Sequence, residues 1–252
     1  MQEWAQAYTG FAEVYDLFMD DVPYEKWCDL ICGVLAEHGI CGGLIAELGC
    51  GTGRMTRLLA QRGYDMIGID SSQEMLSVAR DAGGSDGILY LEQDMCGFEL
   101  YGTVAAVVCV CDSVNYLTDP EDLAQMFRLV NNYLDPGGLF IFDCNTVHKY
   151  RDVLGCATFA ENAEDASYIW ENFFDEESMI NEYCLTIFER RGEMFERYRE
   201  VHYERAYERE DYEKAAMSAG MELVRWYGDY IPAPPDADSE RMVAVFREHG
   251  KA

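Results

Sequence analysis

The sequence is poor in histidine, proline and positive charge. Its 252 residues include four His and six Pro, and 19 Lys and Arg stand against 47 Asp and Glu, for a formal net charge of −28. Binding to a polyanion depends on Lys and Arg that neutralise phosphate. The composition therefore argues against nucleic acid and against an anionic membrane surface as partners. It favours a soluble surface whose charges repel one another.

Long apolar runs and paired cysteines are absent as well. The longest apolar run, Val104 to Cys111, is too short to cross a bilayer, and residues 1–21 lack the cationic start and apolar core of a secretory signal. None of the ten cysteines forms a Cys-x-x-Cys pair, and no His stands near them at metal-ligand spacing. We expect a cytoplasmic protein without a metal site, whose thiols are free and mostly buried.

What the sequence does contain is a regular alternation of strand and helix patterns. Strand, helix, strand, helix with short breaks is typical of an α/β fold with a doubly wound, mostly parallel sheet. Such a sheet binds its ligands at the carboxyl ends of its strands. The expected strands cover 43–48, 64–70, 87–94, 103–111 and 139–145, and the expected helices cover 24–39, 54–63, 72–83 and 119–134.

The pattern changes after the fifth strand. Residues 156–207 contain extended, aromatic-rich segments at 167–174, 181–190 and 193–207, which predict an inserted antiparallel meander. A helix at 210–220 and a hairpin of strands at 221–230 and 241–248 then complete the main sheet. No flexible linker interrupts the chain, so we expect one domain over 1–252.

Three glycines stand directly behind the first expected strand. In ELGCGTGR, residues 47–54, they occupy the alternate positions Gly49, Gly51 and Gly53. Glycine lets a ligand approach the backbone closely, and Asp70 at the end of the second strand can accept hydrogen bonds from a ribose. Together these features predict a nucleoside-containing cofactor. The dinucleotide fingerprint G-x-G-x-x-G is disfavoured, because Arg54 occupies its last position.

The glycine motif behind Glu47 resembles the first motif of class I S-adenosylmethionine-dependent methyltransferases. Asp70 in IGIDSS is similar to the family's ribose-binding acid, and Asp94 and Met95 in EQDMC to the pair beside the adenine. VCDSVNYL and YLDPGGLFIFD are similar to later motifs, in the family's order and spacing. The resemblance implies a Rossmann-like seven-stranded sheet with a reversed last strand, S-adenosyl-L-methionine as cofactor and S-adenosyl-L-homocysteine as product.

The N-terminal residues 1–40 resemble the helical lid of small-molecule members of the family. In that interpretation aromatic side chains close over the cofactor; the alternative is that they belong to the core of a packed helix. The positions that the resemblance places at the cofactor are Tyr8, Tyr15, Trp27, Glu47, Gly49, Cys50, Gly51, Gly53, Asp70, Ser71, Met75, Asp94, Met95, Cys111, Asp112 and Tyr116.

No catalytic residue can be assigned from the motifs. Methyl transfer depends on alignment and on exclusion of water, and a base is needed only where the acceptor must lose a proton early. Asn115 and Tyr116 follow the fourth expected strand and His148 follows the fifth, so these three are candidates at the rim of the crevice. For His148 the alternative is an ordinary solvated loop histidine.

The last strand of the insert has two different faces. Arg199, Tyr203 and Arg205 fall on one face, and Glu200 and Glu204 fall on the other. A face of arginine and aromatic side chains beside the crevice suits an anionic or aromatic substrate. The alternatives are the interface of a homodimer and an ordinary salt-bridged surface.

The sequence therefore predicts a methyltransferase that acts on a small-molecule acceptor under a cap formed by residues 156–207. A tRNA-modifying methyltransferase is the main alternative on substrate, and it would need a basic patch. A non-catalytic domain that binds S-adenosylmethionine is another alternative, and only turnover separates it from an enzyme. A nicotinamide oxidoreductase is disfavoured by Arg54 and Asp94.

Overall fold

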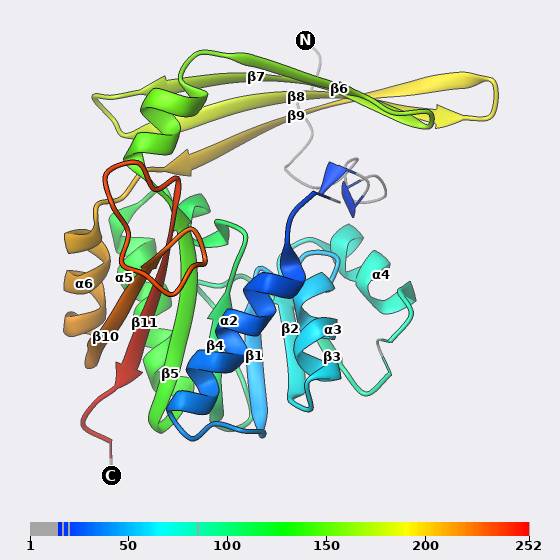
Figure 1. Cartoon of the computed structure of the whole chain (residues 1–252). Helices are drawn as coiled ribbons and strands as arrows, with labels where there is room; N and C mark the ends of the chain where they lie inside the picture. The colour runs from blue at the N-terminus through cyan, green and yellow to red at the C-terminus, as the bar shows by residue number, and fades with distance from the viewer. Residues whose placement is uncertain (1–14, 17, 20, 85, 252) are drawn as a thin grey trace.

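The computed structural model describes residues 15–16, 18–19, 21–84 and 86–251. Its main sheet has seven strands in the order β10-β11-β5-β4-β1-β2-β3 (Figure 1). Neighbouring strands are parallel from β5 to β3, whereas β11 runs antiparallel to both β5 and β10. The expected sheet with a reversed last strand is confirmed. The strands are β1 Leu44–Leu48, β2 Asp65–Asp70, β3 Leu89–Glu92, β4 Val104–Cys109, β5 Leu134–Asn145, β10 Met221–Gly228 and β11 Arg241–Glu248.

Helices cover both faces of this sheet, as in a doubly wound fold (Figure 1). Alternate residues of β5 serve the two faces. Phe140 and Phe142 pack toward α5 and α6, and Leu139 and Ile141 pack toward α2 and α3. Burial on both faces explains why the central strands are continuously apolar. The helices are α2 Tyr24–Glu37, α3 Arg54–Gln61, α4 Gln73–Asp81, α5 Pro120–Tyr133 and α6 Arg209–Ser218, with the short helices η1 Ser113–Tyr116 and η2 Lys149–Leu154.

Local sequence signals explain where several helices begin. The Asp119 carboxylate accepts a hydrogen bond from Glu121 N at 2.8 Å, and Pro120 occupies the first turn of α5. Ser72 Oγ accepts from Met75 N at 3.2 Å at the start of α4. At α6, Glu208 and Asp211 form a reciprocal capping box. These caps fix the helix starts that follow strand ends.

A second sheet lies across the carboxyl end of the main sheet (Figure 1). The chain leaves β5, passes through η2 and forms four antiparallel strands in the order β6-β7-β8-β9. The first of these was not expected from the sequence, and the other three match the extended segments. The strands are β6 Thr158–Asn162, β7 Ala166–Asp175, β8 Ile180–Arg191 and β9 Met194–Arg205.

Two other local features differ from expectation. The fifth strand was expected to begin at residue 139, but β5 already begins at Leu134, which pairs with Val104 of β4. Gly137 takes a positive φ of 74° there, and its N–H donates to Glu248 Oε2 at 2.8 Å. Residues 149–154 form η2, a π-type helix that no sequence signal indicated.

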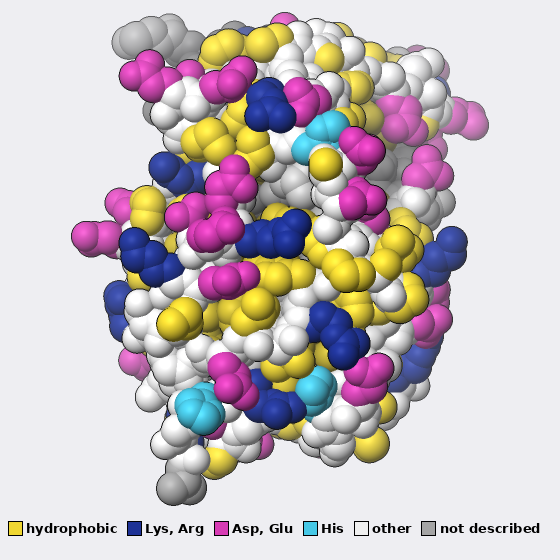
Figure 2. All heavy atoms as spheres, turned by 60° about the vertical axis from the view of Figure 1, so that its left-hand side comes forward, with side chains coloured by type: hydrophobic (Ala, Val, Ile, Leu, Met, Phe, Trp, Pro, Cys, Tyr) yellow, Lys and Arg dark blue, Asp and Glu magenta, His cyan; other side chains and the backbone are white. Residues whose placement is uncertain are grey.

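The surface carries charges of both signs without a concentrated basic area on the face shown in Figure 2. Lys and Arg side chains stand scattered among Asp and Glu and among apolar side chains. Among the described residues, no helix has the length and apolar character needed to span a membrane.

Trp27 of α2 is a core residue. Its ring stacks on Tyr230 with centroids 4.4 Å apart, the Arg241 guanidinium lies 5.2 Å from its centroid, and the side chain is 8% exposed. Trp27 was expected to close over the cofactor, but it lies outside the cavity lining, because the loop after β10 covers its ring. Tyr8 lies outside the described residues.

Replacing Trp27 with Ala should lower the free energy of unfolding by about 3–5 kcal/mol, because a buried aromatic ring is lost and a cavity is left. Urea denaturation measures the loss. The control is Tyr101→Ala, at an exposed side chain between β3 and β4, which should change stability by less than about 0.5 kcal/mol. Equal effects of the two substitutions would contradict a core role for Trp27.

Candidate active site

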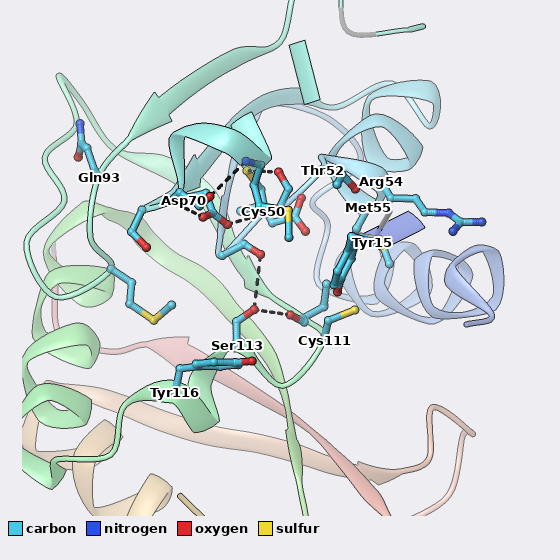
Figure 3. A pocket seen from close by; sticks show the side chains of 18 of the residues that line it. Tyr15, Cys50, Thr52, Arg54, Met55, Asp70, Gln93, Cys111, Ser113 and Tyr116 are labelled. Atoms are coloured by element: carbon cyan, nitrogen blue, oxygen red, sulfur yellow. Dashed lines mark hydrogen bonds between the residues drawn. The ribbon is translucent and has the colours of Figure 1, made fainter. Parts of the chain in front are cut away.

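A cavity of about 280 Å³ lies at the carboxyl ends of β1, β2 and β4 (Figure 3). The loops after these strands and the segment after β3 form its walls. Most of the positions expected at the cofactor line it together, and they come from segments far apart in the sequence. Those positions are Tyr15, Glu47, Gly49, Cys50, Gly51, Asp70, Ser71, Met75, Asp94, Met95, Cys111 and Tyr116.

The glycine turn after β1 has a backbone that other residues adopt only with strain. Gly49, Gly51 and Gly53 have φ values of 65°, 53° and 74°. A Cβ at Gly49 would lie 2.6 Å from Ser113 Oγ, and one at Gly53 would collide with the Tyr90 hydroxyl. Gly51 instead faces open space. Gly53 precedes α3 and does not line the cavity, so its glycine serves packing against Tyr90 rather than close approach of a ligand.

Asp70 is the last residue of β2 and lines the cavity (Figure 3). Its two carboxylate oxygens accept hydrogen bonds from Gly51 N and from Ser72 N, each at 2.8 Å. Burial raises the pKa of this carboxyl, and these backbone donors partly offset the effect. The two bonds hold the carboxylate in one orientation, and each oxygen keeps a lone pair for a further donor.

The cavity is acidic. Glu47, Asp70 and Asp94 line it, and Arg54 is the single Lys or Arg among the described lining residues. Arg54 is held aside, since its Nη1 donates to Met19 O at 3.2 Å and its guanidinium lies 4.9 Å from the Tyr24 ring centroid. Such a lining favours a ligand that carries positive charge.

Glu47 is the deepest of these acids. It is 1% exposed, and its carboxyl accepts a hydrogen bond from Thr56 Oγ1. Burial raises the pKa of Glu47 to about 8. Near neutral pH the group therefore exists largely as the carboxylic acid until a positive charge approaches.

Asp112 does not reach the cavity. Its carboxylate accepts hydrogen bonds from Arg241 Nη2 at 2.8 Å and from Asn145 Nδ2 at 2.9 Å. Burial would raise its pKa, but the positive charges of Arg241 and Lys149 outweigh burial and hold the pKa below its usual value. Asp112 was expected at the cofactor, but it is not a lining residue of the cavity, because these partners turn the side chain toward β5 and β11.

The three catalytic candidates lie in different surroundings. Asn115 is fully buried: its Nδ2 donates to Arg205 O at 2.8 Å, and its Oδ1 accepts from Asn145 N at 3.0 Å. The side chain joins backbone segments and is not available to a ligand. His148 lies outside the cavity, with Nδ1 3.0 Å from Asp152 Oδ2. Tyr116 alone lines the cavity.

The face of β9 that packs toward the main sheet is the acidic face, whereas the arginine and aromatic face was expected there. On β9, Glu200, His202 and Glu204 are 0%, 1% and 3% exposed, whereas Tyr203 on the other face is 50% exposed. Arg205 Nη1 donates to Thr118 O at 3.0 Å. Arg199, Tyr203 and Arg205 are not among the residues that line the cavity, and the acidic face of β9 is buried instead, where the Tyr150 and Tyr183 hydroxyls bind Glu204.

Nine further residues of the described chain line the cavity and were not among the expected cofactor positions. Most are immediate neighbours of motif positions, so the only available signal was adjacency to the motifs. They are Tyr24, Thr52, Arg54, Met55, Ser72, Gln93, Val110, Ser113 and Leu117. His202 had no evident partner in the sequence, and the structure gives it Glu200 and Tyr116.

Comparison with known proteins decides the family. Residues 45–138 match the family described as "Methyltransferase domain". The Bacillus subtilis (strain 168) protein named "Putative methyltransferase YqeM" is 39% identical over 241 residues, which cover 93% of this chain and 94% of that protein. The chain belongs to the class I S-adenosylmethionine-dependent methyltransferases, and S-adenosylmethionine is its cofactor.

Solved structures agree with this assignment. The crystal structure of a S-adenosylmethionine-dependent methyltransferase from Clostridium acetobutylicum ATCC 824 is 32% identical with a TM-score of 0.86, and the match covers 97% of this chain and 100% of that chain. The sugar N-methyltransferase KedS8 from Streptoalloteichus sp ATCC 53650 is 20% identical with a TM-score of 0.79, over 99% of this chain and 97% of that chain. The second likeness shows a shared fold.

The raised pKa of Glu47 has a consequence for stability. A carboxyl that holds its proton up to about pH 8 when folded, against an ordinary pKa of 4.5, contributes stability at low pH that is lost as pH rises to about 8. Relative to Glu47→Gln, the free energy of unfolding of the wild-type protein should fall by up to about 1.4 kcal/mol per pH unit between pH 5 and 8.

Urea denaturation at several pH values gives this difference, and other titrating groups, such as Glu204, cancel in the comparison. Gln is the matched variant because its amide oxygen can still accept the Thr56 bond. Parallel stability curves for the two proteins would contradict a protonated Glu47.

Proposed function

We propose that this methyltransferase transfers the methyl group of S-adenosylmethionine to a small-molecule acceptor, with the cavity as the cofactor site. The observation that carries the proposal is an acidic cavity at the carboxyl ends of the parallel strands, walled by the glycine turn and by Asp70. Bound there, the cofactor supplies a methyl group on a positively charged sulfur. The described lining has three acidic side chains against one arginine, and Glu47, largely protonated near neutral pH, can ionise opposite that charge.

The lining residues suit the parts of this cofactor. The Asp70 carboxylate, already fixed by two backbone donors, would accept the ribose hydroxyls. Gly49 and Gly51 would let the ligand approach the backbone, and Asp94 and Met95 would border the adenine. Glu47 would face the cationic end, and in that position it would give up its proton on binding.

A small acceptor is supported by the insert and by charge. The antiparallel sheet over residues 156–207 lies above the strand ends and would cap the acceptor (Figure 1). The neighbour KedS8 is a sugar N-methyltransferase. We place the protein in the cytoplasm, because its cysteines are all free and thiols persist in reducing compartments.

A tRNA acceptor is less well supported. Such a substrate needs clustered Lys and Arg to neutralise phosphate, whereas the formal net charge is −28. On the face in Figure 2 the basic side chains stand apart from one another.

The role of Asp70 can be measured by cofactor binding. Asp70→Ala should weaken S-adenosylhomocysteine binding about ten- to hundred-fold, since hydrogen bonds to a charged group contribute about 1.5–3 kcal/mol. Isothermal calorimetry gives the affinity. Asp65→Ala is the matched control, because Asp65 begins the same strand at its exposed end, and it should leave the affinity unchanged. An unchanged affinity in Asp70→Ala would refute this ribose site.

The acceptor class can be tested by transfer of label. Purified enzyme with methyl-labelled S-adenosylmethionine should label a component of a fractionated small-metabolite pool and leave total tRNA unlabelled. Asp70→Ala should reduce that labelling in parallel with its loss of cofactor affinity. Labelled tRNA would favour the alternative substrate, and absence of labelling in both pools together with intact cofactor binding would favour a non-catalytic module.

A further inference from the structure

The Tyr116 hydroxyl connects the cavity to a buried histidine. Tyr116 lines the cavity at its lower edge in Figure 3, and its hydroxyl lies 2.9 Å from His202 Nδ1 and 2.5 Å from the Tyr183 hydroxyl. His202 is 1% exposed and stacks on the Tyr183 ring, with centroids 4.6 Å apart. Three elements, η1, β8 and β9, therefore meet at one hydroxyl on the cavity wall.

The partner on the other side of His202 favours one tautomer. Glu200 Oε2 lies 3.3 Å from His202 Nε2, an ion-pair contact and not a hydrogen bond, and Glu200 is fully buried. The negative charge of a carboxylate at that distance favours a ring proton on Nε2 over a lone pair. Nδ1 then presents its lone pair to Tyr116, which donates to it. The Tyr183 hydroxyl lies 3.3 Å from Glu204 Oε1, and burial raises the pKa of Glu204 to about 8. With that proton on Glu204, Glu204 donates to Tyr183 and Tyr183 donates to the Tyr116 oxygen.

In this arrangement His202 is a base whose Nδ1 contacts the Tyr116 hydroxyl. The groups facing His202 are Tyr116 from η1, Tyr183 from β8 and Glu200 from β9, and Glu204 lies one step further, 3.3 Å from the Tyr183 hydroxyl. A proton that reaches Tyr116 can thus pass to Nδ1, where the resulting imidazolium lies beside a carboxylate.

The surrounding charge selects the group that gives up this proton. Inner-face positions of β8 and β9 carry Glu189, Glu196, Glu200 and Glu204, of which Arg191 pairs with Glu189 at 3.0 Å and with Glu196 at 3.8 Å. Glu200 and Glu204 are the acidic groups nearest to Tyr116, and burial raises the pKa of Glu204 to about 8. Nearby Lys149 donates to Asn145 Oδ1 at 2.9 Å, and Arg205 donates to Thr118 O. The Glu200 carboxylate behind His202 favours an ammonium over a carboxylate or phosphate acceptor at Tyr116.

We propose that Tyr116, backed by His202 and Glu200, removes the proton of an ammonium group on the methyl acceptor. An N–H bond of the ammonium breaks, its electron pair stays on nitrogen, and the proton binds to the Tyr116 oxygen. The Tyr116 proton moves to His202 Nδ1. The freed pair makes the nitrogen a nucleophile. Tyr116 is the catalytic residue, and His202 and Glu200 position and activate it. The inference rests on the proposed function.

The tautomer can be tested without knowing the acceptor. In the complex with S-adenosylhomocysteine, ring ¹⁵N shifts of His202 should show Nε2 protonated and Nδ1 accepting a hydrogen bond. Tyr116→Phe should shift the Nδ1 signal and keep S-adenosylhomocysteine affinity within about threefold. The exposed pair of His148 and Asp152 is the control, and its signals should not change. A proton on Nδ1 would overturn the relay.

The charge preference can be tested with three probes of one shape. Benzylamine, benzyl alcohol and benzoate are titrated into the complex with S-adenosylhomocysteine while the His202 nitrogens are observed. Benzylamine should shift them in the wild-type protein, at least about fivefold more weakly in Glu200→Gln, and not in Tyr116→Phe. Benzyl alcohol and benzoate should leave the His202 nitrogen signals unchanged in all of these proteins. An equal response to the three probes, or none to benzylamine, would overturn the ammonium acceptor.

Turnover separates this inference from the proposed function. With the acceptor found by labelling, Tyr116→Phe should lower kcat about 100-fold, whereas His148→Gln should not. Undiminished turnover in Tyr116→Phe with intact cofactor binding would refute the relay alone. Failure of the wild-type protein to bind S-adenosylhomocysteine would instead refute the proposed cofactor site.

Discussion

The buried carboxylate of Asp143 holds the catalytic end of the molecule together. Its oxygens accept hydrogen bonds from Cys111 N at 3.1 Å, Asp112 N at 2.6 Å, Tyr230 Oη at 2.5 Å and Arg241 Nη1 at 2.8 Å. One side chain at the end of β5 thus joins the loop after β4, the loop after β10 and the start of β11. A buried carboxylate is tolerated only because its acceptor capacity is filled and Arg241 opposes its charge.

That carboxylate fixes an otherwise unfavourable backbone. Cys111 and Asp112 have φ values of 57° and 52°, a region that residues with a Cβ rarely adopt. The two N–H groups held by Asp143 keep this turn in place, and η1 starts from it. Asn115 then binds the backbone of Arg205 and of Asn145. The position of Tyr116 thus depends on strand ends in both sheets, which links the cofactor cavity to the insert.

The parts of the site that could be predicted from the sequence depend on local backbone geometry. Gly49 and Gly51 adopt positive φ within a few residues of β1, and Asp70 terminates β2, so chain order alone brought them to one edge of the sheet. Trp27 could not be distinguished as core, since the sequence pattern of an aromatic side chain on a helix is the same whether it covers a ligand or packs against the loop at Tyr230. The alternation of β9 was correct, but its inward face was not. The pattern Glu-x-His-x-Glu at residues 200–204 predicts a solvent-exposed face. The structure buries it because Tyr116, Tyr150 and Tyr183 hydrogen-bond to its side chains.

This difference follows from how the two halves of the site are built. The part of the site that would bind the cofactor is formed by backbone atoms and by carboxylates at strand ends. Short sequence motifs therefore predict it. The acceptor half arises from long-range pairings, in which β9 contacts η1 about 90 residues earlier in the chain, as the bond from Asn115 to Arg205 shows. Residues there acquire their roles only through tertiary partners. His202 is the clearest case, because neither its tautomer nor its access to the cavity exists without Glu200 on one side and Tyr116 on the other.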